Sequence, residues 1–120
     1  MKLTDKQLDI LVRNKIVILS TSSIDRKPRA IFVELNKVED DKIIIANNQM
    51  ETTSKNLIEN KNVFVLVFEK DYHYGLKISG EAQYQTEGEY FDLVSGLETN
   101  KDYSPKGAIV VTIKDVIEFS

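Results

Sequence analysis

A run of hydroxyl, ammonium and amide side chains in the middle of the sequence is the part best suited to bind a charged ligand. Thr52, Thr53 and Ser54 are consecutive, and Lys55 and Asn56 follow them directly. Each hydroxyl could cap the start of the helix that we expect next. Free backbone N–H groups and the positive end of a helix dipole favour an anion at such a place. The run therefore suggests a phosphate site, although helix capping beside a solvated lysine is the commoner reason for such residues.

Three other places carry side chains capable of chemistry. Lys27 and Arg29 flank Pro28 beside a turn, where two cations could reach a phosphate group. His73 stands between two tyrosines and could serve as a general base. Tyr103 precedes an apolar strand and could cover a planar ligand. Taken by itself, each of these is more commonly a solvated or rim residue.

Composition excludes several kinds of site. The chain has 120 residues, no Cys, one His and a formal net charge of −3. The absence of Cys excludes disulfides, thiolate nucleophiles, Cys-zinc sites and Cys-ligated iron–sulfur clusters, and one His cannot build a multi-His metal centre. No carboxylate pair stands out as an acid–base dyad, and we find no Gly-rich nucleotide loop, nucleophile elbow or H-E-x-x-H motif. We therefore predict no metal site and name no catalytic side chain.

Length and charge also limit the partners and the location. A chain of this size fits one domain, which we expect to span residues 1–120. No window reaches the ~18 apolar residues that a membrane helix needs, and the N-terminus lacks the apolar region of a signal peptide. The weakly negative charge disfavours nucleic acid. We therefore expect a cytoplasmic protein without membrane or nucleic-acid partners.

The elements that must position these side chains are mostly strands. Thr4 and Gln7 form a capping-box pattern at the start of a helix that ends near Asn14. Strands are predicted over 16–21, 30–35, 42–46, 63–68, 76–84 and 107–113, with 116–119 as an extension after a kink. Short helices are predicted over 55–60 and 87–97. Gly80 is expected at a bulge or a point of close packing.

Short connections between these strands favour antiparallel pairing. Closure into a barrel removes the open edges of such a sheet. The sequence therefore predicts an α+β, mainly β fold, an antiparallel split β-barrel of six to seven strands with two or three short helices.

Five short stretches follow one another in an order that is typical of one family. They are Val17–Thr21, the D-x-x-P turn within Asp25–Ala30, Thr53–Asn60 with Asn62-Val63 after it, Ile78–Ala82, and Ala108–Ile113. Together they resemble the FMN-binding split-barrel superfamily typified by pyridoxamine 5′-phosphate oxidase. No single stretch is diagnostic, and the resemblance lies in their shared order over nearly the whole chain. The length is closest to the small stand-alone FMN-binding proteins of this superfamily.

The resemblance implies a homodimer with FMN at its interface. The flavin phosphate would lie among Thr52, Thr53, Ser54, Lys55 and Asn56, with Arg29 as a further candidate. The backbone of Ile31, Phe32 and Val33 would line the flavin ring, and Asn47, Asn48 and Met50 would line the ribityl chain or the ring edge. Tyr103 would cover the ring from the partner subunit.

The function implied by the resemblance is electron or hydride transfer by a bound flavin. Electrons would pass between a nicotinamide or a redox-protein partner and an acceptor that the sequence does not identify. The substrate-phosphate Arg and His residues of true pyridoxamine phosphate oxidases are not found, and the family often has Lys where Thr53 stands. Alternatives are a flavin or nitro-compound reductase on the same fold, a non-enzymatic flavin-binding or sensing module, and a barrel that acts as an interaction domain.

Overall fold

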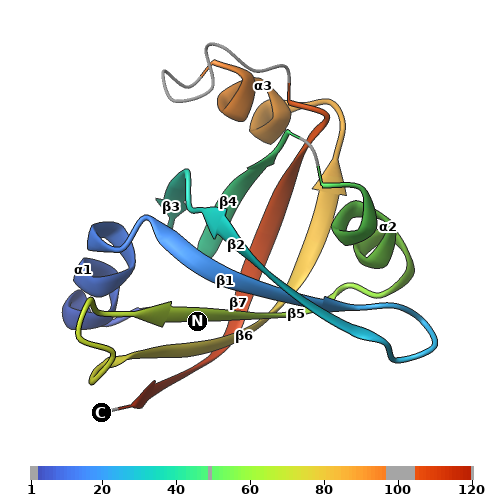
Figure 1. The fold of residues 1–120 in the computed structure, drawn as a ribbon. Coiled ribbons are helices and arrows are strands. Elements are labelled where there is room, and N and C mark those ends of the chain that lie inside the picture. Colours follow the sequence, from blue (N-terminus) through green and yellow to red (C-terminus); the bar gives the residue numbers. More distant parts are fainter. Residues whose placement is uncertain (1–2, 49, 97–104, 120) are drawn as a thin grey trace.

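One antiparallel sheet with helices at its margins accounts for the part of the chain that the computed structural model describes, residues 3–48, 50–96 and 105–119 (Figure 1). The helices are α1 (Asp5–Arg13), α2 (Glu51–Glu59) and α3 (Glu89–Ser95). The strands are β1 (Ile16–Ser22), β2 (Pro28–Glu34), β3 (Lys37–Glu39), β4 (Lys42–Asn47), β5 (Asn62–Phe68), β6 (Gly75–Gln85) and β7 (Gly107–Phe119). Among these residues no helix has the length and apolar character needed to cross a lipid bilayer.

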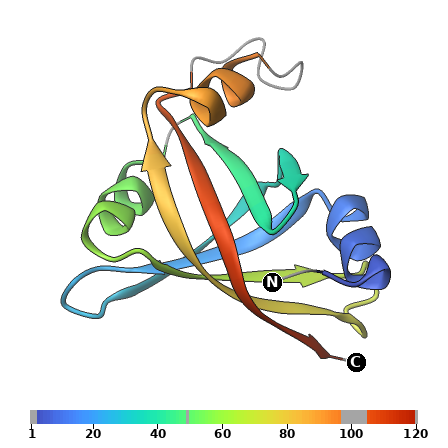
Figure 2. The ribbon, with the colours of Figure 1, turned by 180° about the vertical axis from the view of Figure 1, so that it is seen from behind.

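The strands follow the order β2-β1-β5-β6-β7-β4-β3, and every neighbouring pair is antiparallel. The sheet curls so that β1 and β2 cross the direction of β4 and β7, which Figure 2 shows from behind. The predicted split barrel is therefore confirmed, with β2 at one end of the sheet order and β3 at the other.

The interior of the curled sheet holds the main core, because alternate residues of each strand point inward. Val17 and Leu19 of β1 meet Ile43 and Ile45 of β4 in the same buried cluster. Helix α3 covers the other side of β4 and β7, where Val94 packs in a second cluster with residues of both strands. Burial on both faces explains why β4 and the first half of β7 have nearly continuous apolar sequences.

Gly80 lies where β6 and β7 change register. Ser79 pairs with Asp115 and Gly80 with Ile113, so Lys114 is the extra residue of a bulge in β7. A Cβ on Gly80 would lie 2.6 Å from the carbonyl oxygen of Thr112, which leaves no room for a side chain. The expectation of a bulge and close packing at Gly80 is confirmed, and the bulge accounts for the predicted kink between 113 and 116.

Helix boundaries were predicted less well than strands. The capping box of α1 is confirmed, because the Gln7 backbone N–H donates to Thr4 Oγ1 at 3.1 Å and the Thr4 N–H donates to Gln7 Oε1 at 3.0 Å. Helix α2 begins four residues earlier than predicted, at Glu51, and α3 covers less than the predicted 87–97. The short strand β3 was not predicted.

Candidate functional site

A furrow runs along strand β2 and beside helix α2. It consists of three adjoining hollows with volumes of about 560, 470 and 220 Å³. The first and second hollows share Arg29 and Thr52, and the second and third share Phe32 and Met50. We call this feature the β2–α2 furrow. Small-molecule sites in proteins are typically hollows of a few hundred Å³.

One side of the furrow is the outer edge of β2. Strand β2 stands last in the strand order, so among the described residues its edge toward β1 is the one that belongs to a strand ladder. The other edge therefore offers backbone N–H and C=O groups to a ligand. Ile31 and Val33 point toward the core, whereas Phe32 points outward and is 71% exposed. The three residues whose backbone was predicted to line the flavin ring thus lie along the furrow.

Helix α2 presents a polar face to the first hollow. Thr52, Lys55 and Glu59 lie on that side, at spacings that bring them to one face of a helix. Thr53 and Asn56 turn toward the sheet and are only 2% and 4% exposed. The Asn56 amide Nδ2 donates to Thr21 Oγ1 at 3.1 Å. Asn56 still lines the first hollow and Thr53 the second. Of the five consecutive candidates, Thr52 and Lys55 are the exposed ones that line the first hollow, and neither side chain has a hydrogen-bond or ion-pair partner among the described residues.

The hydroxyl run does not cap α2 as expected. The N-cap is Met50, which makes no side-chain capping bond, and Thr52, Thr53 and Ser54 lie within the first turn. Ser54 Oγ donates to the carbonyl oxygens of Met50 and Glu51, both at 2.9 Å. The prediction of capping by these hydroxyls is wrong because the helix starts earlier than the hydroxyl run.

Three cations surround the first hollow, together with two carboxylates. Lys27 Nζ lies 3.7 Å from Asp25 Oδ2, and Glu59 accepts a long hydrogen bond of 3.4 Å from the Ile24 backbone N–H. Within the described ranges, no carboxylate pairs with Arg29 or Lys55, and both side chains are exposed. These two cations and the Thr52 hydroxyl can therefore bind an anionic group at this end.

Asn47 supports the furrow from inside the fold. Its side chain is fully buried. Oδ1 accepts from the Met50 N–H at 2.7 Å, while Nδ2 donates to the Met50 carbonyl at 3.1 Å and to the Tyr84 hydroxyl at 2.7 Å. Asn47 was predicted to contact a flavin, and the structure places it behind Met50, which itself lines the second and third hollows.

The third hollow contains two side chains that sequence reasoning missed. Glu34 and Asn36 line it together with Asn48 and Met50. Asn36 Oδ1 accepts from the Ala46 N–H at 2.6 Å, so this side chain bridges the end of β2 to strand β4. The outward position of Glu34 follows from the alternation of β2, but its place in a hollow depends on β4 and on the segment after it.

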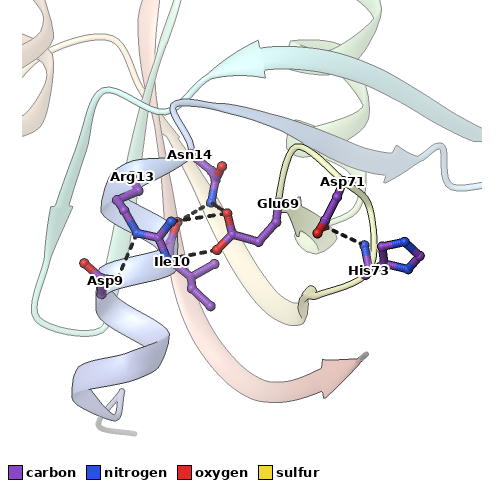
Figure 3. Close-up of polar contacts among 7 residues, drawn as sticks. All are labelled: Asp9, Ile10, Arg13, Asn14, Glu69, Asp71 and His73. Atoms are coloured by element: carbon purple, nitrogen blue, oxygen red, sulfur yellow. Dashed lines mark hydrogen bonds and ion pairs between the residues drawn. The ribbon is translucent and has the colours of Figure 1, made fainter.

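Two candidates from the sequence remain, Tyr103 and His73. Tyr103 lies outside the described residues. His73 is exposed, and its backbone N–H donates to Asp71 Oδ1 at 3.0 Å. Its ring points away from the Asp71 carboxylate (Figure 3). Nothing around His73 in the described part of the chain orients it as a general base.

A second polar cluster joins α1 to the chain after β5. Arg13 Nη2 lies 2.9 Å from Glu69 Oε1, and Arg13 Nε lies 2.9 Å from Asp9 Oδ2 (Figure 3). Hydrogen bonds to these two carboxylates raise the pKa of Arg13 above its ordinary value. The cluster lies beside α1, on the opposite side of the molecule from α2 (Figure 1), and its internal pairing gives it a structural role.

The clustering of possible metal ligands is a further property of the described ranges 3–48, 50–96 and 105–119. They contain no group of three or more His, Asp or Glu side chains that could hold a metal ion. In those ranges the furrow offers hydrogen-bond donors, two cations without a carboxylate partner and a strand edge outside the sheet ladders, which suit an elongated organic anion.

Comparisons with known proteins agree with this description. The sequence matches the family described as pyridoxamine 5′-phosphate oxidase over residues 3–119. An uncharacterized protein of Methanocaldococcus jannaschii is 35% identical over 121 residues, which cover 96% of this chain and 79% of that protein.

Two solved structures show the same fold. HupZ of Group A Streptococcus is 17% identical, with a TM-score of 0.85 over 97% of this chain and 93% of that one. An FMN-binding protein of Syntrophomonas wolfei is 23% identical, with a TM-score of 0.75 over 96% of this chain and 89% of that one.

Proposed function

Because this chain belongs to the pyridoxamine 5′-phosphate oxidase family, we propose that it is a flavoprotein that binds FMN in the β2–α2 furrow. The observation that carries the proposal is the pair of unpaired cations, Arg29 and Lys55, at one end of a furrow whose other wall is a free strand edge. A flavin mononucleotide has the matching order of parts, a phosphate joined by a polar chain to a planar ring.

The phosphate is assigned to the first hollow. Arg29 and Lys55 supply positive charge and Thr52 supplies a hydroxyl donor. The first turn of α2 lies beside them, and its N–H groups lack acceptors within the helix. We therefore assign phosphate binding to these three side chains and give Thr53 and Asn56 a supporting role inside the fold.

The flavin ring is assigned to the second and third hollows. The backbone of Ile31, Phe32 and Val33 offers hydrogen-bonding groups there, and Met50 offers an adaptable apolar surface. Bound FMN would supply the electron or hydride transfer, and the chain would supply binding, orientation and hydrogen bonds to the ring. The proposed role is electron transfer between a reduced nicotinamide or redox partner and an acceptor, in the cytoplasm.

The experiment that tests the proposal is a visible absorbance spectrum of the purified protein, followed by titration with FMN. We expect a flavin band after purification, or saturation at one FMN per chain with quenching of flavin fluorescence. A colourless protein that leaves FMN fluorescence unchanged at micromolar concentrations would contradict FMN binding. Reduction of the bound flavin by NADH or NADPH, followed by turnover with an added acceptor, distinguishes an oxidoreductase from a flavin-storing module.

The proposal includes a homodimer, because the outer face of the sheet beside the furrow is apolar. Phe32 pairs with Ile18, and Ile18 pairs with Leu66 on the next strand, so the three side chains form a row. Phe64 adds a further ring to this face and is 37% exposed. A second copy of the chain placed on this row would bury it and add a further wall to the ring end of the furrow.

Replacing Phe64 by Glu is expected to convert the dimer into a monomer. The substitution places a charge beside the apolar row, on the same face of the sheet, and burying that charge in the interface would cost more free energy than the association provides. Sedimentation velocity of the wild type and of the variant measures the mass of each. If the partner covers the ring, the loss of the dimer should also lower the affinity for FMN. The control is Ile58→Glu on α2, at a position that is 76% exposed. A wild-type protein that is monomeric with full FMN affinity would contradict the dimer.

A further inference from the structure

We propose that Glu34 makes the ring end of the β2–α2 furrow selective for reaction partners that carry positive charge. This inference rests on the proposed function, because it concerns molecules that exchange electrons with a flavin in the furrow. It goes further by naming the charge class of those molecules and the residue that selects them.

The distribution of charge along the furrow is uneven. Glu34 is the one ionisable residue among those that line the third hollow, whose other members are Phe32, Val33, Asn36, Ala46, Asn48 and Met50. The cations Lys27, Arg29 and Lys55 all line the first hollow, at the other end, and Arg29 also lines the second hollow together with the carboxylate of Glu51. A molecule that enters the third hollow therefore meets one charged side chain there, a carboxylate.

The Glu34 carboxylate has no ion-pair partner within 4 Å in the described part of the chain. It forms none of the ion pairs found there. Its neighbour across the ladder is Ile16, an exposed apolar residue that cannot neutralise it. Glu34 itself is exposed at the end of β2. Its charge is therefore available to a molecule entering the third hollow.

An exposed charge of this kind acts mainly on the encounter rate. It raises the local concentration of cations and lowers that of anions, and both effects shrink as salt screens the charge. The effect is largest for small reactants of high charge. Two electron acceptors of opposite charge that do not exchange their ligands, hexaammineruthenium(III) and ferricyanide, therefore serve as probes of the charge at the furrow.

The test compares the wild-type protein with Glu34→Gln, both loaded with FMN and reduced by dithionite. Each reduced flavin gives one electron to each of two metal complexes and releases its protons to the solvent. At low ionic strength, Glu34→Gln should slow oxidation by hexaammineruthenium(III) about threefold to tenfold and speed oxidation by ferricyanide by a similar factor. Glu34→Lys should extend both changes, and high salt should remove them.

The matched control is Glu118→Gln, which removes the same charge near the end of β7, away from α2. It should leave the ratio of the two rates unchanged. A wild-type protein that does not bind FMN would refute the proposed function. Normal FMN binding with the same rate ratio in wild type, Glu34→Gln and Glu34→Lys would refute the role of Glu34 and leave the proposed function intact.

Discussion

Replacing Arg29 and Lys55 together by Ala should weaken FMN binding roughly 100-fold and leave riboflavin binding nearly unchanged, because a hydrogen bond to a charged group contributes about 1.5–3 kcal/mol. Both side chains line the first hollow and neither has a carboxylate partner among the described residues. Riboflavin lacks the phosphate, so it gains nothing from either cation. Each single substitution should weaken FMN binding by about tenfold.

Flavin fluorescence titrations measure these affinities for both ligands. Lys27→Ala is the matched control, because Lys27 lines the same hollow but already faces Asp25 at 3.7 Å. Its effect should be clearly smaller than that of Arg29→Ala. Equal losses of FMN and riboflavin affinity in the double variant would mean that the phosphate lies elsewhere. Thr52→Ala should act in the same direction as the cations, with a smaller effect.

Replacing Asn47 by Leu should destabilise the fold by about 3 kcal/mol, because buried polar groups would lose their partners. The substitution preserves approximate side-chain size but removes the acceptor for the Met50 N–H and the donor to its carbonyl. The Tyr84 hydroxyl would also lose its donor. The segment before α2 would then shift, so FMN affinity should fall together with stability.

Urea unfolding followed by circular dichroism measures the change in free energy. Tyr84→Phe offers a graded comparison, because it removes one of the three bonds made by the Asn47 side chain and leaves the two to Met50. It should cost about 1 kcal/mol. If Asn47→Leu unfolded at the same urea concentration as the wild type, the hydrogen bonds of Asn47 would not be what stabilises the segment before α2.

The strands were predictable because their information is local. Alternating or continuous apolar runs place β1, β5 and β7 without knowledge of their neighbours. The start of α2 was missed because the capping rule favoured the hydroxyl run, whereas a buried amide, Asn47, holds the backbone of Met50 three residues along. That contact involves the strand before the helix, which a search for caps does not consider.

The candidate site was predictable in part for the same reason. Its residue types pointed to an anion, and Arg29, Thr52 and Lys55 do line one hollow. The inward turn of Thr53 and Asn56 follows from which side of α2 meets the sheet, and the sequence alone does not specify this. Glu34 was missed because its hollow arises where β2 approaches β4, two strands that lie apart in the order of the sheet.

The open edge of β2 also bears on how the chain avoids aggregation with other chains. An unpaired strand edge can recruit a strand from another molecule, and proline or charged residues commonly discourage this. Pro28 and Arg29 protect one end of β2 and Glu34 protects the other, but the middle, Ala30–Val33, is apolar. A molecule lodged along that edge would occupy the groups that another strand could pair with, and would therefore act as a shield against aggregation.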